Sequence, residues 1–231
     1  MSDKPPDVST TDHPKLTPRF DDAMVFAAHA HRRQVRKNTG DVPYISHLMS
    51  VAALVLEAGG DEDLAIAALL HDAAEDQGGE EMLMRIRERF GPRVERIVRG
   101  CSDTFELPKP PWTERKLAYL AHLRDEADLD ICMVSAADKI HNARCILTDH
   151  HQFGDDVFAR FRAGDDIDSS KRNTLWYYRE LVTAFQVAAD RNAQGDEDRN
   201  EGLGRLLKEL ERVINVLEEQ ARVDRRDRCR G

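Results

Sequence analysis

Leu69-Leu70-His71-Asp72-Ala73-Ala74-Glu75-Asp76 places four titratable side chains at the polar end of an apolar stretch rich in alanine and leucine. Residues one helical turn apart share a face, so His71 neighbours Glu75 and Asp72 neighbours Asp76. Three carboxylates and an imidazole beside apolar residues repel one another unless a cation, an arginine or shared protons compensate them. A metal ion is the simplest compensation, because the His-Asp pair supplies one nitrogen and one oxygen ligand. The stretch therefore predicts a metal site whose remaining ligands come from elsewhere in the chain.

Composition limits the classes of protein to consider. With 231 residues, 41% hydrophobic and 33% charged, the chain is typical of a soluble helical protein with one domain plus tails. We expect a cytoplasmic protein without a membrane partner, because the apolar runs are short and the polar start has no signal-peptide core. The net charge of −9 disfavours long nucleic acids, although a local basic cluster can bind a small anion. The four cysteines lack a C-x-x-C pair and are expected to be free thiols.

Hydrophobic periodicity predicts an all-α fold with one main domain. Residues 1–18 are polar and read as a flexible tail, residues 19–190 form the helical domain, and the apolar-poor residues 191–202 predict a linker. Residues 203–223 predict an amphipathic helix, followed by a disordered tail over 224–231. Within the domain, apolar spacing predicts helices over about 20–34, 43–58, 61–77, 80–90, 92–100, 113–124, 131–144 and 169–189.

The C-terminal helix carries an apolar stripe formed by Leu203, Leu207, Leu210, Ile214 and Leu217. Burying five such side chains contributes on the order of 10 kcal/mol before ordering costs, so the stripe will not stay exposed. It can fold back on its own domain or pair with a second copy of the chain. The heptad spacing leans slightly towards a homodimer.

Two other predicted helices offer metal-ligating side chains, His47 and Asp138. A lone histidine among apolar neighbours is more often a hydrogen-bonded core residue, which is the alternative for His47. Together with the His71-Asp72 pair they give two nitrogens and two oxygens, a set that suits Mn²⁺, Fe²⁺ or Zn²⁺ better than Mg²⁺. Glu75, close to apolar residues and to another carboxylate, is expected to have a raised pKa, as a general base requires.

Several polar and aromatic residues could contact a ligand near this site. Arg36 and Lys37 belong to a cluster of four basic side chains, which is either a solvated helix end or a phosphate clamp. Lys109, in a proline-rich loop, is either a solvated lysine or a phosphate contact. Asn142 lies one turn after the aspartate of the ligand set and could face the same pocket. In the aromatic run that begins at Trp176, most rings should enter the core, leaving one at most to stack on a base.

The order of these motifs resembles the HD superfamily of metal-dependent phosphohydrolases, and in detail the hydrolase domain of RelA/SpoT-type alarmone enzymes. The resemblance covers about residues 20–190. It rests on Arg36-Lys37, Pro43-Tyr44-Ile45-Ser46-His47, Ala68-Leu69-Leu70-His71-Asp72-Ala73-Ala74-Glu75-Asp76, and Ala137-Asp138-Lys139-Ile140-His141-Asn142-Ala143-Arg144.

This resemblance implies an HD-domain helical bundle that holds a single Mn²⁺ through His47, His71, Asp72 and Asp138. It also implies hydrolysis of the 3′-pyrophosphate of guanosine tetra- or pentaphosphate, which yields GDP or GTP and pyrophosphate. Two alternatives stay open, namely a phosphohydrolase for another nucleotide and a metal- and nucleotide-binding regulator without turnover.

The resemblance also implies roles for individual side chains. Glu75 and Asp76 match a pair that assists the attacking water. Arg36 and Lys37 match a pair that borders the nucleotide, and Asn142 matches a further pocket residue.

Overall fold

The computed structural model describes residues 16–37, 41–105, 108–193 and 197–228. Within these ranges the regular elements are helices, and Val35 and Pro43 form an isolated bridge. The all-α prediction is therefore confirmed. The elements are α1 (Pro18–Ala30), α2 (Ile45–Glu57), α3 (Glu62–Leu70), α4 (Ala73–Gln77), α5 (Gly79–Phe90), α6 (Pro92–Cys101), α7 (Trp112–Asp125), α8 (Leu129–Phe153), the 3₁₀ helix η1 (Gly154–Phe161), α9 (Ile167–Asn192) and α10 (Glu197–Arg228).

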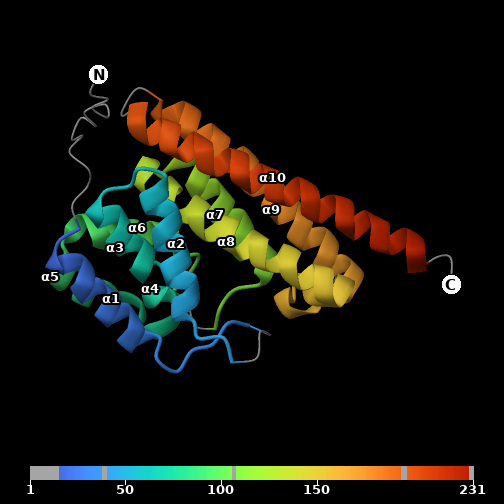
Figure 1. The fold of residues 1–231 in the computed structure, drawn as a ribbon, viewed down its shortest axis with the longest axis horizontal. Coiled ribbons are helices and arrows are strands. Elements are labelled where there is room, and N and C mark those ends of the chain that lie inside the picture. Colours follow the sequence, from blue (N-terminus) through green and yellow to red (C-terminus); the bar gives the residue numbers. More distant parts are fainter. Residues whose placement is uncertain (1–15, 38–40, 106–107, 194–196, 229–231) are drawn as a thin grey trace, which may run out of the picture.

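The helices form two groups that meet at α8 (Figure 1). Helices α1 to α6 gather on one side, and the long helix α10 runs along α8 and α9 on the other. Helix α8 contacts α2, α3 and α6 from the first group and α9 and α10 from the second. None of the helices in the described part of the chain combines the length and apolar character that a membrane crossing needs.

Aspartate side chains cap several of the helices. Asp61 accepts a hydrogen bond from the backbone N–H of Leu64 at the start of α3, and Asp128 accepts one from Ile131 at the start of α8. At the start of α9, Asp166 and Ser169 form a reciprocal capping box. Each cap satisfies a backbone donor that the helix itself cannot pair. These acidic residues therefore fix helix starts.

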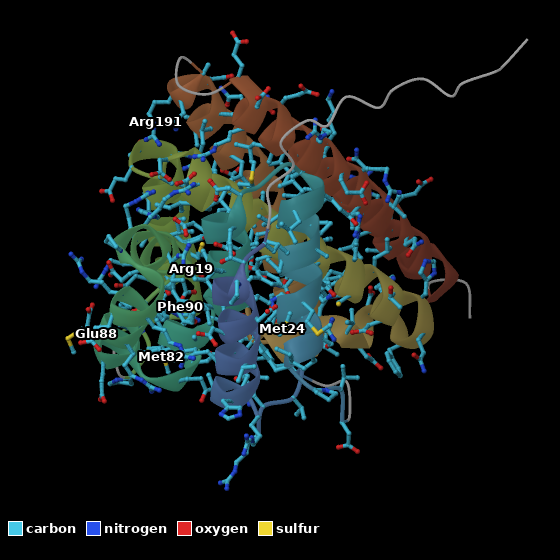
Figure 2. The ribbon with its side chains drawn as sticks, turned by 60° about the vertical axis from the view of Figure 1, so that its left-hand side comes forward. Arg19, Met24, Met82, Glu88, Phe90 and Arg191 are labelled. Atoms are coloured by element: carbon cyan, nitrogen blue, oxygen red, sulfur yellow. The ribbon has the colours of Figure 1, made fainter. Side chains whose placement is uncertain are left out.

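Arg19 ties α1 to the helices behind it. Its guanidinium donates to the Asp63 carboxylate and to the Phe90 carbonyl, each at 2.8 Å, and Figure 2 shows Arg19 beside Phe90. The rings of Phe26 and Phe90 also meet edge to face, with centroids 5.6 Å apart. Helix α1 is thereby fixed against α3 and α5, and the basic segment that follows it starts next to the pocket described below.

Helix α3 is buried on every side, since residues 64–70 are all inaccessible to solvent. A helix that is apolar all round belongs in the interior, and this one carries His71 and Asp72 into it. The sequence predicted one helix over 61–77, whereas the structure interrupts it at these two residues. The His71 ring hydrogen-bonds the Ala68 carbonyl, the acceptor that a continuous helix would offer to the N–H of Asp72.

The predicted linker over 191–202 is largely helical. Helix α9 runs to Asn192 and α10 begins at Glu197. The polar side chains in this segment have specific partners: Arg191 donates to the Ala127 carbonyl, and Arg199 donates to the carboxylates of Asp61 and Asp130. Composition predicted that this segment is solvated, but Arg191 and Arg199 bond to groups beside the starts of α3 and α8.

The predicted tails fall mostly outside the described residues. The N-terminal tail lies outside them up to residue 15, and Pro18 already belongs to α1. At the other end α10 continues to Arg228, so the tail predicted to begin at 224 is helical there, while residues 229–231 lie outside the described part.

The apolar stripe of α10 is buried within its own chain. Its members have at most 6% of their surface exposed, and α10 packs along α8 and α9. The fold-back alternative therefore describes this structure, and the stripe is not available as the seam of a homodimer. The heptad spacing did not distinguish the two alternatives, because packing on the neighbouring helices α8 and α9 needs the same apolar period as a coiled coil.

We predict that Leu210→Ala lowers the free energy of unfolding by about 2–5 kcal/mol, because Leu210 is fully buried and its removal leaves a cavity. Urea denaturation followed by circular dichroism measures this. Lys208→Ala, on the exposed face of α10, is the matched control and should change the value by less than about 0.5 kcal/mol. Equal effects of the two substitutions would contradict the packing of α10 described above.

Candidate active site and metal centre

Three separate parts of the chain bring the predicted metal ligands together. His47 comes from the first turn of α2, His71 and Asp72 from the junction of α3 and α4, and Asp138 from α8. Ligand atoms of His47, His71 and Asp138 all lie within 4.8 Å of one another, and these three residues are buried. Asp72 Oδ2 lies 3.1 Å from His71 Nε2 and 3.5 Å from His47 Nε2. Two imidazoles and two carboxylates thus converge on one point.

The donor set fits a divalent cation. Among the described residues, His47 Nε2 and His71 Nε2 have no hydrogen-bond partner although both are buried and carboxylate oxygens lie 3.1 Å away. Burial alone would lower the pKa of His71, but Asp72 and Asp138 raise it well above its ordinary value. The carboxylates thus favour positive charge at this point, and a cation would also satisfy both nitrogens. Two nitrogens and two oxygens suit an ion of the Mn²⁺, Fe²⁺ or Zn²⁺ type.

Neighbouring groups hold three of the four predicted ligands in place. His71 Nδ1 lies 2.8 Å from the Ala68 carbonyl, which can only accept, so Nδ1 carries a proton, and in the neutral ring Nε2 then presents a lone pair. The Tyr44 hydroxyl donates to Asp72 Oδ2 at 2.6 Å. His47 Nδ1 lies 2.8 Å from a nitrogen of a second imidazole, His141 Nδ1.

Asp138 connects the metal centre to the nucleotide-facing residues predicted from sequence. Lys139 donates to its Oδ2 at 2.6 Å, and Asn142 donates to its Oδ1. Asn142 in turn accepts a hydrogen bond of 2.7 Å from Arg36 Nη2. Burial would raise the pKa of Asp138, but the Lys139 ammonium and the two imidazoles hold it well below its ordinary value. The carboxylate is therefore ionised, as a ligand must be.

A cavity of about 420 Å³ opens over the metal centre. His47 and His71 lie buried beneath it. Most of the other residues predicted for the site line its wall: Arg36, Lys37, Asp72, Glu75, Asp76, Lys109, Asp138 and Asn142.

Trp176 is not among the residues described around the cavity, and 38% of its surface is exposed. Tyr177 and Tyr178 line the cavity instead, because successive residues of α9 point about 100° apart. Trp112, at the start of α7, also lines it and was not predicted. Its position directly after a proline pair is the signal that could have found it, since such a loop is ordered.

The two candidate catalytic carboxylates have different surroundings. Glu75 accepts hydrogen bonds from Lys109 Nζ at 2.7 Å and from the backbone N–H of Asp103 at 3.2 Å. Asp76 accepts one from Gln34 Nε2 at 2.7 Å. Burial and the negative charge of Asp103 raise the pKa of Glu75, and Lys109 only partly opposes them. The sequence predicted this direction from the apolar surroundings and from the adjacent Asp76. In the structure the carboxylates that add to burial are Asp103 and, less strongly, Asp72.

Sequence reasoning also missed three cationic side chains of the cavity wall. Arg115 and Lys116 on α7 both donate to Asp103, and Arg160 of η1 donates to Asp149. The basic pair that follows Trp112 was a visible signal, but only the fold shows that it faces the cavity. The wall therefore combines acidic and basic groups.

Fold and site together define the class of this protein: an all-helical domain in which two histidines and two aspartates form one centre. The family model described as HD domain matches residues 23–167, which is more than half of the sequence. The chain belongs to the HD-domain family.

Similar proteins carry names that refer to one nucleotide. The mouse guanosine-3′,5′-bis(diphosphate) 3′-pyrophosphohydrolase MESH1 is 36% identical over 125 residues, which cover 53% of this chain and 66% of MESH1. The enzyme of that activity name from Aquifex aeolicus is 42% identical over 134 residues, 58% of this chain and 18% of its own. The chain thus spans slightly less than two thirds of MESH1.

A solved structure titled as a metazoan ortholog of SpoT that hydrolyses ppGpp superposes with a TM-score of 0.61. The superposition covers 84% of this chain and 96% of the other, at 21% sequence identity. This likeness supports the fold.

We predict that His71→Ala and Asp72→Ala each abolish stoichiometric metal binding, because each removes a ligand from the centre. Glu75→Gln should retain full metal content, since its side chain bonds to Lys109 rather than to the centre. Elemental analysis of the three purified variants after loading and desalting makes the comparison. Full occupancy in Asp72→Ala would refute its assignment as a ligand.

Proposed function

We propose that this protein is a Mn²⁺-dependent hydrolase that removes the 3′-pyrophosphate of guanosine tetra- or pentaphosphate to give GDP or GTP and pyrophosphate. The observation that carries the proposal is a single cavity in which the metal centre, the Glu75-Asp76 pair and the cations Arg36, Lys37 and Lys109 meet. The activity names of MESH1 and of the Aquifex enzyme support the choice of substrate.

In this proposal His47, His71, Asp72 and Asp138 hold the cation, which supplies Lewis-acid chemistry for phosphoryl transfer when bound. Glu75 takes the proton of the attacking water, for which its raised pKa suits it at neutral pH.

The remaining wall residues bind the nucleotide. Arg36 and Lys37 neutralise phosphate charge from one side of the cavity, and Lys109 does so from the other. Asn142, held between Asp138 and Arg36, keeps the basic side chain in register with the metal centre. Trp112 and Tyr178 offer the apolar and aromatic surface that a base requires.

The choice of Mn²⁺ over Fe²⁺ or Zn²⁺, a cytoplasmic location and the absence of a long nucleic-acid partner belong to the same proposal. The donor set is compatible with all three ions. The described cysteines, Cys101, Cys132 and Cys145, are free thiols, which is compatible with a reducing compartment.

A nucleotide panel with the Mn²⁺-loaded protein tests the proposal. We expect free pyrophosphate and GDP from guanosine tetraphosphate, and loss of this turnover in Glu75→Gln at unchanged metal content. Release of orthophosphate from ordinary mononucleotides would establish the alternative of another nucleotide phosphohydrolase. Tight binding of guanosine tetraphosphate without any product after long incubation would establish the non-catalytic regulator instead.

The proposed role of Glu75 predicts how the pH profile responds to its neighbours. Glu75 acts as a base only when deprotonated, so activity falls as the pH drops through its raised pKa. Lys109 lowers that pKa and Asp103 raises it. Lys109→Met should therefore move the acidic limb of the kcat/KM profile to higher pH, and Asp103→Asn should move it to lower pH.

Metal content measured across the same pH range is the control, because protons also compete for the ligands. Shifts in the same direction for the Lys109 and Asp103 variants would contradict the role of Glu75 as the base.

A further inference from the structure

The hydrogen-bond partner of His47 Nδ1 is of an unusual type for a histidine proposed to bind a metal. His47 Nδ1 and His141 Nδ1 face each other at 2.8 Å, with ring centroids 4.8 Å apart. His141 lies on α8, three residues after Asp138, and is half-buried. A ligating histidine more commonly donates its second ring N–H to a carboxylate, a backbone carbonyl or water. Here the only hydrogen-bonding group described at that nitrogen is another imidazole.

The contact allows two proton arrangements. A neutral imidazole has one N–H and one lone pair, so a hydrogen bond between two such nitrogens needs the proton on one of them. If His141 donates, the proton of His47 lies on Nε2. If His47 donates, its Nε2 presents a lone pair to the metal centre.

Metal binding at His47 Nε2 requires the second arrangement. Asp138 Oδ1 and Asp72 Oδ2 lie 3.1 and 3.5 Å from Nε2, so these carboxylates attract positive charge to that position. A cation that takes this place would bind through the Nε2 lone pair, which leaves the ring proton of His47 on Nδ1. A lone pair at Nε2 matches the arrangement at His71, whose Nδ1 proton is fixed by the Ala68 carbonyl.

We propose that His141 is a positioning residue that accepts the Nδ1 proton of His47 and thereby fixes the tautomer and ring orientation in which His47 binds the metal. The inference rests on the metal centre of the proposed function. It adds that the two histidine ligands are oriented by different means, His71 by backbone and His47 by a replaceable side chain. The acceptor is an uncharged ring, so it orients His47 without adding a further negative charge next to Asp72 and Asp138.

Two substitutions of His141 distinguish its role as a hydrogen-bond acceptor from its role in packing. In His141→Asn, the amide oxygen occupies the position of the imidazole Nδ1 and can still accept from His47. In His141→Phe, the ring is retained and the acceptor is lost. His122→Phe is the matched control, because His122 lies on α7 and bonds to Glu126 away from the cavity.

The experiment measures metal affinity in the absence of nucleotide. Apoprotein of each full-length variant is titrated with Mn²⁺ and with Zn²⁺ against a chromophoric chelator, after thermal melting has shown that each variant is folded. We expect His141→Phe to bind both ions about 10- to 100-fold more weakly than wild type. His141→Asn and His122→Phe should stay within about threefold of wild type, which is under 0.7 kcal/mol.

Several results would overturn the inference. Wild-type affinity in His141→Phe would show that the acceptor is dispensable, and an equal loss in His141→Asn would show that ring packing matters instead. Nitrogen-15 NMR of the Zn²⁺-loaded protein gives an independent reading, because it should find the His47 proton on Nδ1, and a proton on Nε2 would refute the tautomer. Failure of wild type to bind either ion would overturn the metal centre as well, whereas lack of alarmone hydrolysis would leave the His141 result intact.

Discussion

One buried and one half-buried carboxylate beside two buried imidazoles form the constraint on which this structure depends. Removing carboxylates from water costs several kcal/mol per ion unless nearby positive charge compensates them. The four residues come from α2, from the α3–α4 junction and from α8, so no local segment can assemble the site alone. A cation that links these elements couples its binding free energy to their packing, because the ligands converge only in the folded chain.

Helix α8 contributes to the metal centre through one face and packs against α10 through the other. Its inner face supplies Asp138 together with Lys139 and Asn142, which bond to the same carboxylate. Its outer face is covered by α10, whose apolar stripe is buried there. Arg199 fastens the start of α10 to Asp61 and Asp130, which belong to the starts of α3 and α8. The C-terminal helix therefore stabilises the two helices that position the aspartates and His71.

The features of the fold and site that depend on local sequence patterns could be predicted from the sequence. Helix starts, the buried character of α3 and the four convergent ligands follow from period, capping residues and chemistry. The role of Trp176 stays a prediction, because which face of α9 meets the cavity depends on the rotation of this helix, and Tyr177 and Tyr178 are the residues of the aromatic run that line it. Composition also did not indicate the helical structure of residues 197–202, because it does not show that Arg199 has one buried and one half-buried carboxylate within reach.

The charges of the cavity wall explain how an acidic protein can accommodate an anion. Several of the lysines and arginines described there already face carboxylates, as Lys109 faces Glu75 and Arg160 faces Asp149. An anionic ligand gains binding free energy only to the extent that it attracts these cations more strongly than the carboxylates do. Phosphate groups with more than one charge and three acceptor oxygens meet that condition better than a single carboxylate. In the proposed function, the same exchange would free Glu75 from Lys109 when phosphate binds, so that the proposed base would lose the neighbour that lowers its pKa.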